Sequence, residues 1–351
     1  MVDGYLRVAV IATAILAVAG SWFYTRWITF PPQKLCGSPD GPPVTASRIL
    51  LKDRRHLAYY EFGVPKEHAK YKIIIVHGFL SSPNTAFNPT SEVMEELGVY
   101  MVGYDRAGYR QSDPNPNRSV ESEAMDIEQL ADAMQLGSRF YVIGYSLGGH
   151  AIWGSLKYIP HRLAGAALMS PVINHNWPSF PKNLSDEGRN RYNVGDQWVF
   201  NVAYHTPWLL NWWLSQPFLP SFTVIKGTTH CSNKLDAQFI DEKHRNGDFA
   251  KGFKGATQQG IHESLYRDLM VMFGKWKFEP IDLLPPPVSV PVHLFQGDED
   301  GLVPATLQRY IVGRLPWIKY HEIPSTGHYL TAIPAFGDRV LKTLLLSNHG
   351  D

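Results

Sequence analysis

This sequence of 351 residues has few cysteines, little net charge and no recognisable metal-binding spacing. The two cysteines, Cys36 and Cys231, do not make a disulfide framework, which excludes the small disulfide-rich class of secreted domain. A formal net charge of +1 leaves no basic surplus for binding nucleic acid. The histidines lack the spacing of metal ligands, so we expect neither a metal nor a cofactor. The chain is long enough to bury one large hydrophobic core.

A long apolar run lies near the N-terminus, where Val8 to Tyr24 is nearly free of polar side chains. It is just long enough to approach a hydrocarbon core of about 30 Å. We therefore predict that residues 1–30 form a single-pass N-terminal membrane anchor, with an endomembrane such as the endoplasmic reticulum as the expected location. The alternative is a signal peptide, cleaved near Ala17 to Ala19, and a secreted protein.

Proline and glycine are frequent between residues 31 and 47, which suits a linker between the membrane and a folded domain. Beyond it, short apolar runs alternate with helical patterns, of which Ser119 to Leu136 is the clearest. This alternation predicts an α/β fold with a mostly parallel sheet flanked by helices. The predicted strands are Leu57–Phe62, Lys72–Val76, Val99–Tyr104, Phe140–Ile143, Gly165–Met169, Val292–Phe295 and Lys319–Ile323.

The stretch from Phe140 to His150 reads Phe-Tyr-Val-Ile-Gly-Tyr-Ser-Leu-Gly-Gly-His. Its first part predicts a buried strand that ends at Gly144, and a helix is expected to follow. The pentapeptide that begins there fits Gly-x-Ser-x-Gly, the sharp strand-to-helix turn that exposes a serine hydroxyl above a sheet. Ser146 is therefore the candidate nucleophile, and the alternative is an ordinary glycine-rich turn.

A serine nucleophile requires a histidine base, an acid that orients the base, and donors for an oxyanion. Upstream, an apolar strand runs into a His-Gly-Phe segment, so the backbone N–H groups of Phe79 and Leu147 are candidate oxyanion donors. Downstream, one loop beyond a strand holds the carboxylates Asp298 and Asp300, and the loop beyond the last strand holds His328. Each required group thus has a candidate.

With serine, acid and histidine in this order, the chain resembles the α/β-hydrolase superfamily over about residues 48 to 345. The resemblance aligns Ser146 with the nucleophile, His328 with the base, and Asp300 with the acid of the Gly-x-x-Asp-x-x-Val-Pro pattern. Asp298 is the rival acid, and its alternative role is to hydrogen-bond its own turn. Arg110 departs from the family pattern, because it replaces the second glycine of Asp-x-x-Gly-x-Gly-x-Ser and puts the shape of that loop in doubt.

The interval between the strands that end at Met169 and begin at Val292 is far longer than a crossover needs. We predict a helical cap at residues 173–274, including part of a core helix, inserted between core segments 48–172 and 275–348. Its first half is rich in aromatic residues. Three compatible roles are expected for them: they line an apolar pocket over the serine, pack the cap onto the domain, or enter the membrane beside the anchor. These residues are Trp177, Phe180, Trp198, Phe200, Tyr204, Trp208, Trp212, Trp213, Phe218 and Phe222.

The predicted function is a membrane-anchored serine hydrolase that cleaves a carboxylic ester, or else a thioester or amide, of a small apolar substrate through an acyl-enzyme. Nucleic acid is not expected as a partner. Two alternatives stay open. An acyltransferase would use the same triad with an alcohol as acceptor, and a hydrolase-like binding protein would keep the pocket without turnover.

Overall fold

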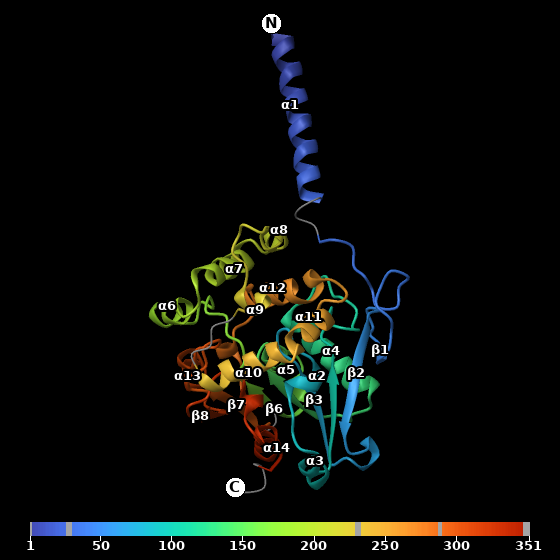
Figure 1. The fold of residues 1–351 in the computed structure, drawn as a ribbon, viewed down its shortest axis with the longest axis vertical. Coiled ribbons are helices and arrows are strands. Elements are labelled where there is room, and N and C mark those ends of the chain that lie inside the picture. Colours follow the sequence, from blue (N-terminus) through green and yellow to red (C-terminus); the bar gives the residue numbers. More distant parts are fainter. Residues whose placement is uncertain (1, 26–29, 229–232, 287–289, 347–351) are drawn as a thin grey trace.

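The structure is a computed structural model that describes residues 2–25, 30–228, 233–286 and 290–346. Helix α1 (Val2–Phe23) projects away from a folded domain that contains all the other elements (Figure 1). Its stretch Gly4–Trp22 has a mean hydropathy of 1.7 and none of it is buried. One apolar N-terminal helix of this kind is what a membrane anchor or a signal peptide would provide.

In the described part of the chain, eight strands form one sheet in the order β1-β2-β4-β3-β5-β6-β7-β8. β2 runs antiparallel to both of its neighbours, and the pairs from β4 to β8 are parallel. The sheet is therefore mostly parallel, as predicted. The strands are β1 (Ser47–Leu50), β2 (His56–Gly63), β3 (Tyr71–Val76), β4 (Val99–Tyr104), β5 (Phe140–Tyr145), β6 (Leu163–Met169), β7 (Val292–Gly297) and β8 (Ile318–Ile323).

Helices cover both faces of the sheet, because its strands are apolar on both sides. Along β3, Ile74 and Val76 join a core with α4 (Val120–Ala133), α5 (Gly148–Tyr158) and α13 (Ala305–Arg314). The alternate residues Ile73 and Ile75 join a second core with α3 (Ser91–Leu97) and α14 (Phe336–Leu346). A short helix, α2 (Pro83–Ala86), follows β3. The predicted α/β fold, a mostly parallel sheet flanked by helices, is confirmed.

The predicted strands all form, with ends that differ by at most two residues from the predicted ones. The short edge strand β1 was not predicted, because its four residues lie where the linker was expected to end. The predicted helix at 119–136 is α4, and Ser119 caps it in a capping box with Ser122.

A run of helices between β6 and β7 forms the cap, which lies over the carboxyl ends of the strands (Figure 1). The core helix expected at the end of this interval consists of a π-helical turn, η5 (His262–Tyr266), and α12 (Arg267–Phe273). The cap helices before it are α6 (Lys182–Asn190), α7 (Val194–His205), η4 (Pro207–Leu209), α8 (Leu210–Ser215), α9 (Thr223–Lys226), α10 (Lys234–Arg245) and α11 (Asp248–Ala256). The segment that follows α1 lies against the end of this run, where the backbone N–H of Cys36 donates to the side chain of Gln259.

Candidate active site

Ser146 occupies the sharp turn between β5 and α5. Its φ of 52° lies in the left-handed region, which a non-glycine residue adopts only where the surrounding structure enforces it. A Cβ on Gly144 would lie 2.5 Å from Ile152, and one on Gly148 would lie 2.2 Å from the carbonyl oxygen of Val76. Both flanking glycines are thus required by close approach, and the unusual dihedral falls on the serine itself.

The structure brings together the three residues that the sequence singled out, from the ends of β5, β7 and β8. The Ser146 Oγ lies 2.9 Å from Nε2 of His328, and Nδ1 of His328 lies 2.9 Å from Oδ2 of Asp300. A carboxylate can only accept, so Nδ1 carries the proton and Nε2 is free to accept from the serine hydroxyl. This is the arrangement that general-base activation of a serine requires.

The two candidate acids play different parts in their loop. Asp300 is buried, and its Oδ1 accepts from the backbone N–H groups of Leu302 and Val303. Its Oδ2 accepts from the Gln296 amide as well as from the histidine. Asp298 accepts from the backbone N–H of Thr326 instead, at 3.2 Å. The geometry therefore favours Asp300 as the acid that orients the histidine.

Comparison with known proteins agrees with this architecture. A family model described as alpha/beta hydrolase fold matches residues 71–331. The chain belongs to the alpha/beta hydrolase fold family. No curated protein sequence matches it.

Several solved structures resemble this alpha/beta hydrolase at low sequence identity. A thermophilic esterase from Thermogutta terrifontis is 17% identical over 87% of this chain and 100% of the other, with a TM-score of 0.58. MGS-M2, an alpha/beta hydrolase enzyme from a Medee basin deep-sea metagenome library, is 17% identical over 87% and 99%, with a TM-score of 0.61. An esterase from Exiguobacterium antarcticum is 15% identical over 86% and 99%, with a TM-score of 0.56. At these identities the likeness establishes the fold.

The electrostatics of this hydrolase site centre on His328. Burial lowers the pKa of the imidazole, but the carboxylates of Asp300 and Asp236 raise it, and the net result is a pKa above the ordinary value. The protonated form that arises when histidine accepts a serine proton is thereby stabilised. The site favours proton transfer from Ser146 to His328.

Asp236 is a residue of the site that sequence reasoning missed. It lies in the first turn of α10, in the cap, and its carboxylate accepts from the backbone N–H groups of His328 at 2.6 Å and of Tyr329 at 3.0 Å. Asn233 caps the same helix and donates to Glu299 and to the carbonyl of Ser325. The cap therefore holds the loop that carries the histidine. The only sequence signal was the helix-capping pattern of Asn233, which does not reveal what the helix faces.

Of the two predicted oxyanion donors, Leu147 follows the serine directly, and Phe79 follows Gly78, on which a Cβ would lie 3.0 Å from the Cβ of Ser146. Within the described part of the chain, the backbone N–H groups of Phe79 and Leu147 donate no hydrogen bond. The loop before Phe79 is fixed by His77, whose Nδ1–H donates to the carbonyl of Gly78 and whose Nε2 accepts from the backbone N–H of Arg106. Burial, together with the charge of Arg106, lowers the pKa of His77 far below its ordinary value, so this histidine is neutral.

Arg110, the departure from the family pattern, keeps a glycine-like backbone. Its φ is 43°, and its carbonyl accepts from the side-chain amides of Gln258 and, at 3.0 Å, of Gln259. Because the end of the cap holds this turn, a side chain is tolerated where the family pattern has glycine. The side chain of Arg110 lies along the wall of the pocket described next.

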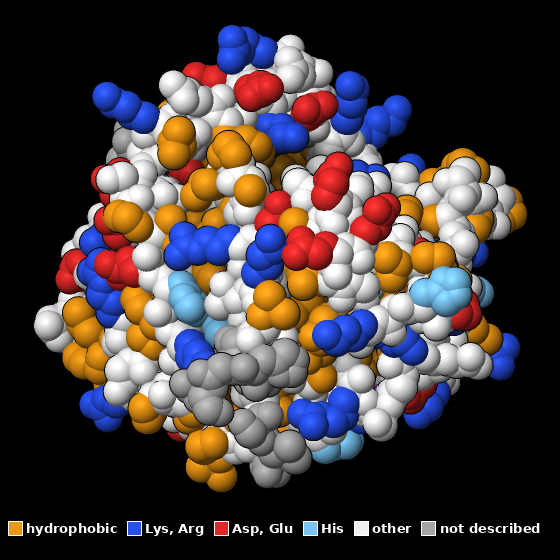
Figure 2. All heavy atoms as spheres, turned by 90° about the horizontal axis from the view of Figure 1, so that it is seen from below, with side chains coloured by type: hydrophobic (Ala, Val, Ile, Leu, Met, Phe, Trp, Pro, Cys, Tyr) orange, Lys and Arg blue, Asp and Glu red, His pale blue; other side chains and the backbone are white. Residues whose placement is uncertain are grey.

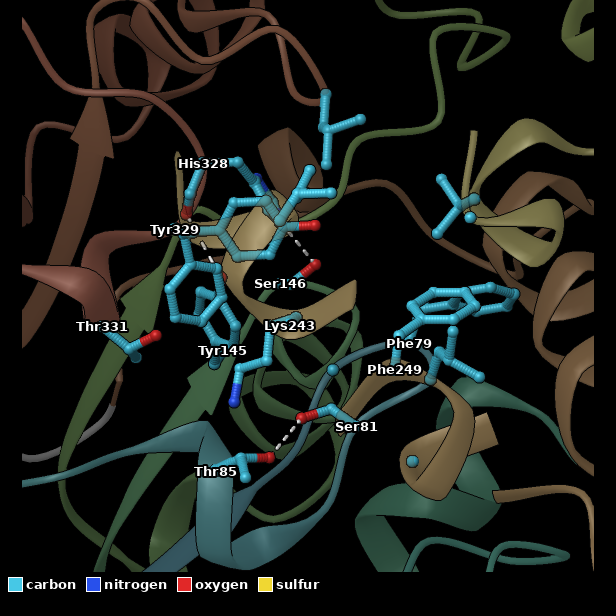
Figure 3. A pocket seen from close by; sticks show the side chains of 18 of the residues that line it. Phe79, Ser81, Thr85, Tyr145, Ser146, Lys243, Phe249, His328, Tyr329 and Thr331 are labelled. Atoms are coloured by element: carbon cyan, nitrogen blue, oxygen red, sulfur yellow. Dashed lines mark hydrogen bonds between the residues drawn. The ribbon is translucent and has the colours of Figure 1, made fainter. Parts of the chain in front are cut away.

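A pocket of about 550 Å³ opens at the serine and the histidine. Apolar side chains make up part of its lining, and they include Val172, Phe222, Met272, Phe273 and Val303. Polar and charged side chains from the loop after β3 and from α2, α10 and α11 also line it, and they include Ser81, Thr85, Lys243, Asp248 and Lys251. Figure 3 shows the Lys243 side chain extending toward the hydrogen-bonded pair of Ser81 and Thr85.

The cap aromatics differ in burial, and few of them line the pocket. Of the ten named from the sequence, Phe222 alone lines the pocket. Trp177, Phe180 and Phe200 are buried in packing. Trp198, Trp208 and Phe218 are more than half exposed. The cap contributes to the pocket mainly through α10 and α11, which the sequence analysis did not single out.

Proposed function

We propose that this alpha/beta hydrolase cleaves a carboxylic ester of an apolar substrate through an acyl-enzyme. The observation that carries the proposal is the chain of hydrogen bonds from Ser146 through His328 to Asp300, with 2.9 Å at each step, in which Ser146 and His328 line a pocket. His328 takes the proton as the serine attacks and gives it to the departing alcohol, while Asp300 holds the imidazole in the required tautomer. Water, deprotonated by His328, then attacks the acyl-enzyme and releases the acid, and the proton returns to Ser146.

The backbone N–H groups of Phe79 and Leu147 are the proposed donors to the oxyanion. Helix α5 begins directly after Leu147, so the positive end of its dipole also lies near the developing charge. The low dielectric of a buried site strengthens both effects.

The test is labelling of the detergent-solubilised full chain with a fluorophosphonate probe. Wild type is expected to label, Ser146→Ala to lose labelling, and His328→Ala to label far more slowly. Ser138→Ala, at an exposed serine just before β5, is the matched control and is expected to label like wild type. A folded wild-type protein that does not label would contradict the proposal and favour a ligand-binding protein.

An acceptor experiment separates hydrolysis from acyl transfer. We expect the released acid to remain the main product when a short alcohol is added to an ester assay. Transfer product formed at the expense of acid would instead identify an acyltransferase that uses the same residues.

We further propose that α1 stays attached as a single-pass anchor in an endomembrane such as the endoplasmic reticulum. Its apolar stretch Gly4–Trp22 spans about 29 Å as a helix, which matches a hydrocarbon core. The helix also continues to Phe23, past the small residues at 17–19 where a peptidase would cut. Intact mass of the protein purified from membranes is expected to include α1, and a mass beginning near residue 20 would indicate a cleaved signal peptide.

A further inference from the structure

Residues 192–225 of the cap, from Tyr192 to Ile225, are almost free of charged side chains. The segment contains no lysine, arginine or glutamate, and one aspartate, Asp196. That carboxylate is buried and accepts from Asn193 and from the backbone and hydroxyl of Thr223. Apart from His205, the segment therefore exposes no aspartate, glutamate, lysine or arginine side chain.

The same segment exposes large apolar side chains. The exposed fractions are 69% for Val194, 51% for Trp198, 58% for Trp208 and 75% for Phe218. We call these four residues the aromatic patch. They belong to adjoining elements, because the ring of Trp198 stacks on Trp213 of α8, whose Nε1–H donates to Pro220 just after Phe218. Exposed tryptophan and phenylalanine in such a group mark an interaction surface.

The patch lies beside the point where the membrane helix joins the domain. Helix α8 packs against η5, and His262 of η5 contacts the ring of Phe30, with the centroids 5.8 Å apart. The guanidinium of Arg267 lies 4.5 Å from the same ring. The chain that leaves α1 is thus fixed on the element that α8 touches, and Figure 1 shows α7 and α8 at the end of the domain nearest α1.

The opposite end of the molecule differs in character. Figure 2, seen from the side away from α1, shows lysine, arginine, aspartate and glutamate side chains scattered over the face, with hydrophobic side chains among them. A surface of mixed charge suits water, whereas tryptophan on an uncharged surface suits the boundary between headgroups and acyl chains. The domain is therefore polar at one end and adapted to an interface at the end that carries α1.

We propose that the aromatic patch docks into the interfacial layer of the same bilayer that α1 spans. The occupant is lipid, because the patch adjoins a helix of membrane-spanning length and lacks the charge that a polar partner would select. Two contacts then fix the domain on the membrane. Tyr192 and Phe222, which lie just before and just after the patch in the sequence, line the pocket. This inference rests on the proposal that α1 is retained as an anchor, and not on the serine chemistry.

The test places single cysteines in the full chain, labels them with an environment-sensitive fluorophore, and reconstitutes the protein in nanodiscs of phosphatidylcholine. Trp208→Cys and Phe218→Cys report on the patch, in a background where Cys36 and Cys231 are replaced by alanine. Leu346→Cys, which is 41% exposed at the end of α14, is the control at the opposite end. Ile15→Cys reports on α1. Thermal melting checks that each variant is folded.

Labels at Trp208 and Phe218 are expected to be quenched by a lipid nitroxide about 5 to 10 Å below the headgroups, while the label at Leu346 is not. Equal, weak quenching at the patch and at Leu346, with Ile15 quenched, overturns the proposal. If the patch labels become shielded from water only at a high protein-to-lipid ratio, the occupant is a second copy of the chain. This outcome also overturns the proposal. An unquenched Ile15 label refutes the anchor and this inference together. If the wild-type protein does not react with the fluorophosphonate probe, the hydrolase proposal is refuted. The quenching of the cysteine labels is expected to be the same in that case.

Discussion

The core loops and the cap are held in place by different interactions. In the core, Asp300 alone accepts from Gln296, Leu302, Val303 and His328. The base of the cap is instead a cluster of rings, in which Phe200 and Phe273 lie 3.9 Å apart between centroids and Phe222 packs against both. Directional hydrogen bonds fix the reacting atoms, and apolar packing fixes the wall around them.

Under the proposed function, we expect changes in the core loops to affect turnover and changes in the cap to affect the choice of substrate. Asp236 is the exception, since a cap residue holds the backbone of His328. Variants on each side of the boundary test the division.

The largest effects are expected in the core loops. Ser146→Ala should lower kcat for a p-nitrophenyl ester about a millionfold, and Asp300→Asn about 10⁴-fold, because the amide no longer fixes the tautomer of the histidine. Initial rates with purified protein check both. Asp298→Asn is the matched control, and a loss as large as that of Asp300→Asn would mean that the acids are assigned wrongly.

A stability effect is expected at the base of the cap. Phe273→Ala should lower the free energy of unfolding by about 3 to 5 kcal/mol, because it removes a buried ring from the aromatic cluster. Phe218→Ala makes the same change at an exposed site, and in detergent it should change stability by about 0.5 kcal/mol or less. Denaturant titration compares the two, and equal losses would show that the cap does not depend on its buried rings.

An intermediate effect on catalysis is expected from the cap residue that reaches the core. Asp236→Asn should lower kcat about tenfold, because one of two acceptor oxygens for the backbone of His328 and Tyr329 is replaced by a donor. It also removes a charge that raises the pKa of His328.

The pH profile of activity distinguishes this positioning role from a general disturbance of the folded structure. His328 must be neutral to accept a proton, so wild-type activity should fall as the pH drops through a pKa above the ordinary histidine value. In Asp236→Asn this acidic limb should move to lower pH. Asp186→Asn in α6 is the matched cap control and should leave both kcat and the limb unchanged. A tenfold loss without any movement of the limb would contradict the electrostatic part of the prediction.

The smallest effect is expected at the charged side chains that line the pocket. Lys243 lies 3.6 Å and Lys251 3.9 Å from Asp248, so two lysines share one carboxylate. Lys243→Gln should raise KM for an ester with a terminal carboxylate up to about fivefold, as befits a solvent-exposed ion pair, and should not change KM for its neutral methyl ester. An equal rise for both esters would show that the lysine acts by shape and not by charge.

The fold was largely predictable from the sequence, because it depends on local patterns. The central strands β3 to β7 are mostly apolar runs, and the α4 helix begins after the cap residue Ser119. The edge strand β1 could not be predicted, since its four residues carry no such pattern and pair only because β2 lies beside them.

Within the candidate site, the sequence by itself determined the residues with local or family signatures. The Gly-x-Ser-x-Gly pattern indicated Ser146, and the resemblance of the chain to the α/β-hydrolase superfamily indicated Asp300 and His328. The positions of these side chains, 2.9 Å apart at each step, required the sheet to bring three loops to one edge.

Only the tertiary structure decided what the cap contributes. The contact between Asp236 and His328 joins residues that are 92 positions apart, and nothing in the sequence near either one encodes it. The same holds for α10 and α11 as the pocket wall, and for the division of the aromatics into buried and exposed groups. Side-chain type sets what a residue can do, whereas its burial and its neighbours depend on how distant segments pack.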